Sequence, residues 1–193
     1  MSTAPIRRLT PEEYLAAERA SDRKHEFYRG EMFAMAGASR KHVAVTGNFF
    51  AWLHYQLRDE PCTVFTSDMR VEVERTGLYT YHDISVTCEQ PEFGDGHFDT
   101  LLNPQMIVEV LSPSTETYDR GKKFDHYRQV ASLKEYVLVS LDQPMIERYT
   151  RVDEDRWTLD VAKGFEATVE LSVTSEPLPL AEVYRRVDFS ADE

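Results

Sequence analysis

The sequence predicts a mixed α/β (α+β) fold in which a mixed β-sheet is flanked by helices. The main observation is a pair of nearly all-apolar runs, 105–111 and 135–140, separated by a helical pattern over 118–130. A strand, a helix and a second strand in this order form a crossover unit, so we expect the two strands to run parallel in one sheet. A second observation is the near-helical spacing of apolar residues over 39–58, which predicts a long amphipathic helix.

The N-terminal part predicts a short helix and a β-hairpin. Thr10 precedes Pro11, and Glu13 follows three residues after Thr10, a combination typical of a helix start. We expect that helix over 11–20. Two short apolar-rich runs, 25–28 and 31–36, flank Arg29 and Gly30, which predicts a hairpin turn.

The remaining segments read as strands joined by turns. Runs rich in β-forming residues cover 62–66, 69–74 and 78–87, and a polar loop is expected over 90–103. After the crossover unit, the segments 145–150, 157–161 and 169–173 predict an antiparallel extension, and 180–187 predicts a terminal helix. We expect a single domain over residues 1–193, with its core at about 9–140 and the β-rich extension at 141–193.

Cysteine usage and hydropathy predict a cytoplasmic protein. Cys62 and Cys88 are far apart in sequence and lie in no CxxC motif, so we expect neither a disulfide framework nor a zinc site. No segment approaches the ~18–20 apolar residues that span a bilayer, so no membrane partner is expected.

The charge of the chain limits how it can bind nucleic acid. The sequence holds 34 acidic and 22 basic residues, a formal net charge of −12. A protein that grips a phosphate backbone usually has a basic face. Any nucleic-acid groove must therefore be local, and the acidic excess is otherwise a solvated surface.

A carboxylate inside the apolar run 105–111 is the first candidate for chemistry. Glu109 lies in the middle of this predicted central strand, where a buried carboxylate needs a partner or a function. Asp83 lies in the run 78–87, and neighbouring strands would bring the two carboxylates together. Hard oxygen ligands of this kind suit Mg²⁺ or Mn²⁺, and the Val110 carbonyl is a third ligand if the strand end splays.

A lysine on the helical segment 118–130 is expected to complete this site. Periodicity puts Lys123 on the stripe that carries Phe124 and Tyr127, whereas Lys122 falls on the polar face. Lys123 is therefore aimed at the sheet. A lysine there stabilises charge on phosphoryl oxygens or helps to position a water molecule.

Asp83, the Glu109–Val110–Leu111 segment and the helical Lys123, in this order, resemble the PD-(D/E)XK nuclease superfamily. More narrowly, the chain resembles the bacterial family of restriction-endonuclease-like proteins in which the lysine has moved to the helix. The resemblance covers about 9–140 and implies a restriction-endonuclease-like core. His82 stands where that family usually has proline.

The resemblance implies roles for individual residues. Asp83, Glu109 and Lys123 would be catalytic. Glu26 would join the metal ligands Asp83, Glu109 and Val110. Contacts with substrate or with groups near it would come from His42, Arg120 and Tyr127.

The implied function is Mg²⁺- or Mn²⁺-dependent hydrolysis of nucleic-acid phosphodiesters by a homodimer, with DNA as the expected substrate. An alternative is a nuclease-fold module that no longer cuts and serves in binding or assembly. A structural reading of Glu109 also stays open, in which it forms a buried ion pair with Lys123 or Arg120.

Overall fold

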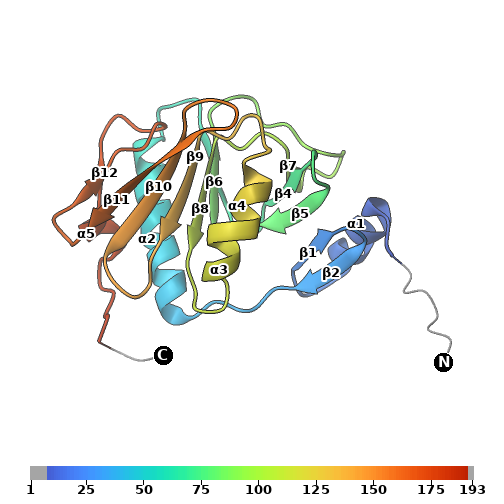
Figure 1. The fold of residues 1–193 in the computed structure, drawn as a ribbon, viewed down its shortest axis with the longest axis horizontal. Coiled ribbons are helices and arrows are strands. Elements are labelled where there is room, and N and C mark those ends of the chain that lie inside the picture. Colours follow the sequence, from blue (N-terminus) through green and yellow to red (C-terminus); the bar gives the residue numbers. More distant parts are fainter. Residues whose placement is uncertain (1–7, 191–193) are drawn as a thin grey trace.

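The computed structural model describes residues 8–190, which form two large β-sheets and the helices around them (Figure 1). The helices are α1 (Pro11–Arg19), α2 (Arg40–Gln56), α3 (Glu116–Tyr118), α4 (Phe124–Tyr127) and α5 (Leu180–Val183), and a π-helical turn, η1 (Asp119–Lys123), joins α3 to α4. The strands are β1 (His25–Tyr28), β2 (Glu31–Ala34), β3 (Thr63–Thr66), β4 (Arg70–Val73), β5 (Leu78–Tyr81), β6 (Ile84–Thr87), β7 (Thr100–Leu101), β8 (Met106–Val110), β9 (Glu135–Val139), β10 (Met145–Arg151), β11 (Trp157–Lys163), β12 (Thr168–Val169) and β13 (Leu178–Pro179).

The five-stranded sheet has the order β2-β1-β5-β4-β7 and lies beside α1. The capping box predicted for α1 is present, since Thr10 accepts from the Glu13 N–H and the Glu13 carboxylate accepts from the Thr10 N–H. The predicted hairpin is β1–β2. Arg29 and Gly30 have φ values of 51° and 86°, the left-handed pair that a tight hairpin turn requires.

The six-stranded sheet has the order β11-β10-β9-β8-β6-β3. β8 and β9 pair in parallel, which confirms the crossover unit predicted from the two apolar runs. β6 pairs antiparallel with β8, so the strands that carry Asp83 and Glu109 are neighbours as expected. β10 and β11 continue the same sheet antiparallel, which confirms that part of the predicted extension.

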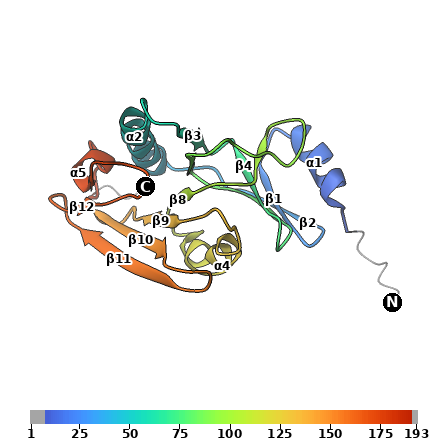
Figure 2. The same cartoon turned by 90° about the horizontal axis from the view of Figure 1, so that it is seen from above.

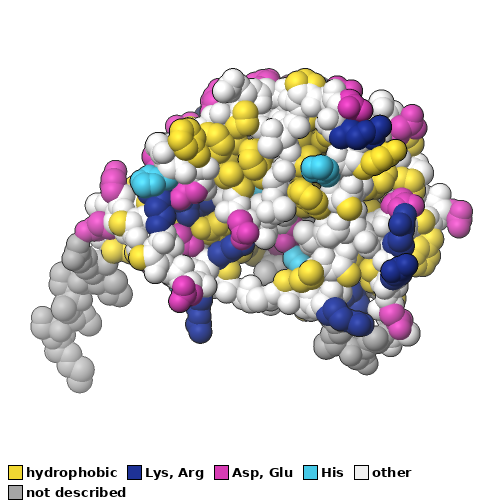
Figure 3. Space-filling model, turned by 180° about the vertical axis from the view of Figure 1, so that it is seen from behind, with side chains coloured by type: hydrophobic (Ala, Val, Ile, Leu, Met, Phe, Trp, Pro, Cys, Tyr) yellow, Lys and Arg dark blue, Asp and Glu magenta, His cyan; other side chains and the backbone are white. Residues whose placement is uncertain are grey.

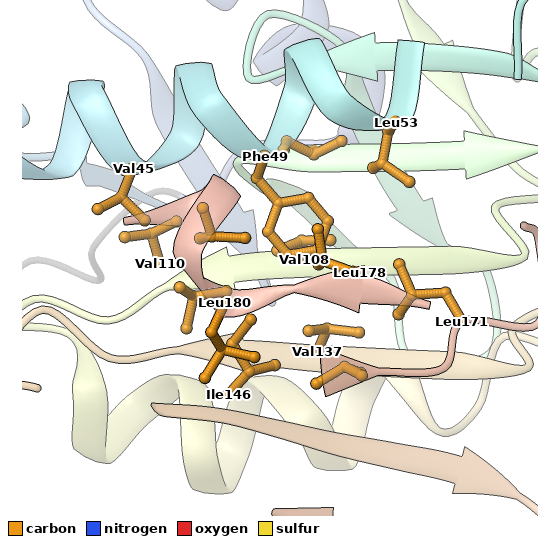
Figure 4. Close-up of a cluster of buried hydrophobic side chains, with 14 of the residues drawn as sticks. Val45, Phe49, Leu53, Val108, Val110, Val137, Ile146, Leu171, Leu178 and Leu180 are labelled. Atoms are coloured by element: carbon orange, nitrogen blue, oxygen red, sulfur yellow. The ribbon is translucent and has the colours of Figure 1, made fainter. Parts of the chain in front are cut away.

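Helices cover both faces of this sheet. Figure 2 shows α2 and α5 on one side of β8 and β9 and α4 on the other. On the α2 side, Val45, Phe49 and Leu53 point at the sheet and pack against Val108 and Val137 (Figure 4). On the α4 side, a second core joins the six-stranded sheet to the five-stranded one, and it includes Val71, Leu78, Ile107, Phe124, Tyr127 and Tyr136. The fold is therefore the mixed sheet flanked by helices that the sequence predicts.

The run 78–87 is not one strand. It divides at His82 and Asp83 into β5, which pairs with β1 and β4, and β6, which pairs with β3 and β8. The chain thus passes from one sheet to the other at this point. Both halves are equally β-forming, and only their different pairing partners separate them.

Three C-terminal and loop predictions also need correction. In place of a strand over 169–173 the structure has the short β12, and beyond it the Ser172 N–H donates to the Glu135 carboxylate at 2.9 Å. The terminal helix ends at Val183 rather than near 187, and Arg186 adopts a left-handed φ of 60°. The segment 90–103 contains the short strand β7, which pairs with β4.

The expectation that the cysteines stay unpaired is wrong. β3 and β6 pair antiparallel, with Thr63 opposite Thr87, so Cys62 and Cys88 lie opposite each other and form a disulfide. Their separation of 26 residues hid this, because their proximity arises only when the two strands pair.

Charged side chains of both signs are mixed on one face of the molecule. On the face shown in Figure 3, lysine and arginine side chains lie in small groups beside aspartate and glutamate, with hydrophobic side chains between them. Within residues 8–190, no helix is both long and apolar enough to cross a membrane.

Candidate active site

The alternation of β8 turns Glu109 toward the α4 side of the sheet. All five residues of β8 are buried. Met106, Val108 and Val110 belong to the α2-side core, whereas Ile107 lies in the α4-side core and Glu109 shares its side of the strand. Only 4% of Glu109 is exposed, so its carboxylate depends on protein groups for compensation.

Lys123 is the nearest cation to this carboxylate. Its Nζ lies 2.9 Å from Glu109 Oε1, and the Tyr127 hydroxyl donates to the same oxygen at 3.1 Å. As the apolar stripe predicts, Lys123 is buried and Lys122 is exposed. The π-helical turn carries Lys123 toward the sheet, and its Nζ also donates to the Tyr81 carbonyl at 2.9 Å. Turns of this kind are frequent at functional sites.

Three carboxylates surround the Lys123 ammonium. Besides Glu109, Asp119 Oδ1 lies 3.5 Å and Glu26 Oε1 3.6 Å from its Nζ. Burial acts to lower the pKa of Lys123, but these carboxylates outweigh it and raise that pKa well above its usual value. Burial raises the pKa of Glu109 well above its usual value, against the opposing effect of Lys123. The lysine is therefore charged, while the carboxylates beside it compete for one cation.

Glu26 reaches this cluster from β1 of the other sheet. The Thr80 hydroxyl donates to Glu26 Oε1, and the Tyr118 hydroxyl donates to Glu26 Oε2 at 3.0 Å. Its side chain is only 13% exposed. The two sheets thus contribute to one group of charges.

Asp83 lies at the end of β8 where pairing with β6 stops. The last paired residues are Ile84 and Val108, and beyond them the Val110 N–H donates to Asp83 Oδ2 at 2.7 Å. At this end of β8 the Asp83 side chain, rather than a backbone group of β6, is the partner of the strand. The adjacent His82 ring is fully buried, and burial lowers its pKa to about 3, so it adds no charge beside Asp83.

His42, in the first turn of α2, covers this end of β8. Its Nε2 lies 3.3 Å from Asp83 Oδ2, and its ring also interacts with the Val110 carbonyl. Burial acts to lower the pKa of His42, but the hydrogen bond and charge of Asp83 raise it overall. Two of the residues expected to bind metal, Asp83 and Val110, are thus in contact with one imidazole.

Asp119 is a member of the cluster that the sequence reasoning missed. It is 3% exposed, and its Oδ1 makes no hydrogen bond to the described residues, with Lys123 at 3.5 Å as an ion-pair partner. Burial raises its pKa. Its position four residues before Lys123 was the available signal, because residues at that spacing share a helix face.

Arg120 and Tyr127, which the resemblance places near the substrate, both contact carboxylates of the protein in the structure. The Arg120 guanidinium pairs with Glu116 at 2.7 Å and with Glu147. Tyr127 is fully buried and contacts Glu109, so it acts on this site through that carboxylate.

The donor set fits a hard divalent cation in type and charge. Glu26, Glu109 and Asp119 surround one lysine, Asp83 pairs with His42, and the buried Asp119 Oδ1 lacks a hydrogen bond within the described residues. Oxygen donors with excess negative charge are what Mg²⁺ and Mn²⁺ bind. Within residues 8–190, no three histidine, cysteine, aspartate or glutamate side chains already form a metal-binding group.

Comparisons with known proteins bear on the family and the fold. The model of a protein family described as "Uma2: Putative restriction endonuclease" matches residues 11–180. Two Synechocystis sp. proteins are also similar. "Uncharacterized protein sll1609" is 36% identical over 172 residues, covering 89% of this chain and 97% of that protein. "Uncharacterized protein slr1290" is 35% identical over 189 residues, covering 97% of each.

A solved structure shares the fold. It is the crystal structure of a "putative nuclease belonging to DUF820" from Anabaena variabilis, with a TM-score of 0.74 at 18% identity. The similarity covers 94% of this chain and 98% of that one. The fold predicted from the sequence is therefore confirmed over nearly the whole chain.

Proposed function

Because the chain belongs to the Uma2 family of restriction-endonuclease-like proteins, we propose that it is a Mg²⁺- or Mn²⁺-dependent endonuclease that hydrolyses the phosphodiester bonds of DNA. The observation that carries this proposal is the surplus of buried carboxylates around Lys123, next to the end of β8 that the Asp83 carboxylate contacts. A buried group of this charge is costly unless a cation joins it.

Different residues of the chain would bind the cation and stabilise the reacting phosphate. Asp83, Glu109 and the Val110 carbonyl would hold the cation, with Glu26 as a further ligand. When bound, the cation would polarise the scissile phosphate and lower the pKa of a bound water. The Lys123 ammonium remains charged beside Glu109, where it would stabilise negative charge on the phosphoryl oxygens.

Other residues support these groups. Tyr127 holds Glu109 through its hydroxyl, which makes it a positioning residue. His42 is in place to contact a phosphate beside Asp83. Arg120 would contact the DNA strand further along if its guanidinium leaves Glu116 and Glu147. We further propose that the 193 residues act as one nuclease-like domain, as a homodimer in the cytoplasm where the DNA substrate lies. This location rests on the proposed substrate, because the Cys62–Cys88 disulfide removes the cysteine argument for a reducing compartment.

A second candidate is a nuclease-fold module that binds or assembles without cutting. The net charge of −12 favours it, as does the contact of Lys123 with Glu109, which resembles a structural ion pair. The two candidates differ in what Glu109 does. A metal ligand loses cation binding on substitution, whereas a structural partner loses stability.

The test is cleavage of supercoiled, linear and single-stranded DNA with MgCl₂ or MnCl₂, alongside calorimetric titration of the cation. We expect Asp83→Ala and Glu109→Ala to lose at least about 100-fold in cleavage rate and to lose cation binding. Asp59→Ala, an exposed carboxylate on another surface, is the control and should leave both unchanged. Absence of both cation binding and cleavage in the wild type would favour the non-catalytic module.

A further inference from the structure

A pocket of about 290 Å³ opens beside Asp83 and His42. It lies between the first half of α2 and the turn after β3, and Ser67 forms part of that turn. Because Asp83 and His42 line it, whatever fills the pocket would touch the site described above. The pocket is thus continuous with the proposed cation site.

The walls of the pocket are mainly apolar. Val43, Phe50 and Ile84 provide hydrophobic surface, and the Thr46 and Ser67 hydroxyls lie among them. The described lining includes no lysine or arginine. The imidazole of His42 faces Asp83, and Lys24, which donates to the Ser67 carbonyl, pairs with Asp68. An uncharged flat ring suits this lining, because it stacks on an aromatic side chain and hydrogen-bonds to hydroxyls at its edge.

We propose that this pocket receives the nucleobase next to the scissile phosphate, so that the enzyme acts on strands that are unpaired at that position. The inference rests on the proposed nuclease function. The volume of about 290 Å³ is just below the ~300–1,000 Å³ typical of ligand pockets, which suits a small ligand such as a single base. A paired base would have to leave its stack first, at a cost that disfavours intact duplex.

Gly47 allows the pocket to be filled without touching Asp83 or His42. It lines the pocket from α2, and a Cβ added there meets no atom within 4 Å. Gly47→Leu should therefore occupy the space of the base. Leucine also has a higher helix propensity than glycine, so the variant should unfold at the same or a higher temperature than wild type. Ala44→Leu, on the exposed side of the same helix, is the matched control.

The experiment measures binding and cleavage separately. Binding of fluorescein-labelled single-stranded, flapped and fully paired DNA is followed by anisotropy in CaCl₂, with the strand checked for integrity, and cleavage is followed in MnCl₂. We expect wild type and Ala44→Leu to bind unpaired DNA at least about tenfold more tightly than duplex. Gly47→Leu should bind unpaired DNA about tenfold more weakly than wild type, while its unfolding temperature stays the same or rises.

Each result decides between the two proposals. Equal binding of unpaired DNA by Gly47→Leu and wild type, or a wild-type preference for duplex, would overturn the pocket proposal while cleavage by wild type keeps the nuclease. Loss of binding in Gly47→Leu without cleavage by wild type would support the pocket and overturn the nuclease. No binding and no cleavage of any DNA by wild type would overturn both.

Discussion

Arg70 and Lys123 are both buried cations, yet Asp99 beside Arg70 and Glu109 beside Lys123 have pKa values shifted in opposite directions. Arg70 lies 3.0 Å from Asp99, which also pairs with Arg19, and the hydrogen bonds of Arg19 lower the pKa of Asp99. Around Lys123, burial instead raises the pKa of Glu109. In the first cluster two arginines face Asp95 and Asp99. In the second, three carboxylates lie within 3.6 Å of one ammonium.

The difference separates a structural group of charges from one suited to bind a cation. We call the Arg70 cluster balanced, because it has two arginines for two carboxylates, and each carboxylate there stabilises the fold. We call the Lys123 cluster unbalanced, because carboxylates that lack a full cationic partner lose hydration without an equal electrostatic gain. The second cluster adjoins the end of β8, where the Asp83 carboxylate takes the place of backbone pairing with β6. Substitutions in the two clusters should therefore differ in the sign of their effects on stability.

Removal of the central cation should have the largest effect. Lys123→Met leaves Glu26, Glu109 and Asp119 without their ammonium, and we expect the free energy of unfolding to fall by about 3–5 kcal/mol in metal-free protein. Urea denaturation measures this change. Lys122→Met is the control, because Lys122 is exposed, and it should stay within about 0.5 kcal/mol of wild type. Equal losses in both variants would contradict a central role for Lys123.

Loss of a carboxylate from the balanced cluster should destabilise less. Asp99→Asn removes the charge that Arg19 and Arg70 share, and we expect a loss of about 1–2 kcal/mol, reduced because the Asp99 side chain is 34% exposed. The same denaturation series measures it. Asp59→Asn, whose side chain is 83% exposed, should cost less than about 0.5 kcal/mol. A gain in stability for Asp99→Asn would remove the contrast between the clusters.

Loss of a carboxylate from the unbalanced cluster should have the smallest effect and the opposite sign. Glu109→Gln should raise the free energy of unfolding of metal-free protein by about 1 kcal/mol near pH 8. The pKa of Glu109 is raised on folding, so its stabilisation is complete below its unfolded pKa and is lost as pH rises through the folded pKa. The gain should therefore disappear toward acid pH.

Denaturation from acid to mildly alkaline pH in EDTA checks this sign. The pKa of Asp99 is lowered on folding, so its contribution is present above its unfolded pKa and is lost as pH falls through the folded value. Asp99→Asn should consequently flatten the acid side of the profile, and Glu109→Gln the alkaline side. A Glu109→Gln variant less stable than wild type at all pH values would identify the Glu109–Lys123 contact as a structural ion pair.

Local patterns in the sequence were enough for much of the site. The uninterrupted apolar run around Glu109 predicted a central strand, and helical spacing distinguished Lys123 from Lys122. Both depend on residues close together in the chain. Glu26 lies on a hairpin far from Lys123 in sequence, and only the family resemblance indicated it.

Features that depend on pairing between distant strands were not predictable in this way. The division of the run 78–87 follows from its two sets of partners, and nothing in its residues marks the change at His82. The Cys62–Cys88 disulfide likewise requires β3 and β6 to pair in one register. Asp119 is different, because it lies four residues before Lys123 and this spacing alone predicts that both share one helix face.

The passage of the chain between sheets at Asp83 ties the site to the cooperativity of the fold. Glu26 and the Tyr81 carbonyl come from one sheet, Glu109 from the other, and Lys123 contacts all three. Tyr81 also accepts a hydrogen bond from Arg70, so it connects the two charge clusters. A cation bound here would link two units that could otherwise open separately, and its binding free energy would be added to the cost of such partial unfolding. The same ligands would then govern both chemistry and whether the molecule unfolds in one step or two.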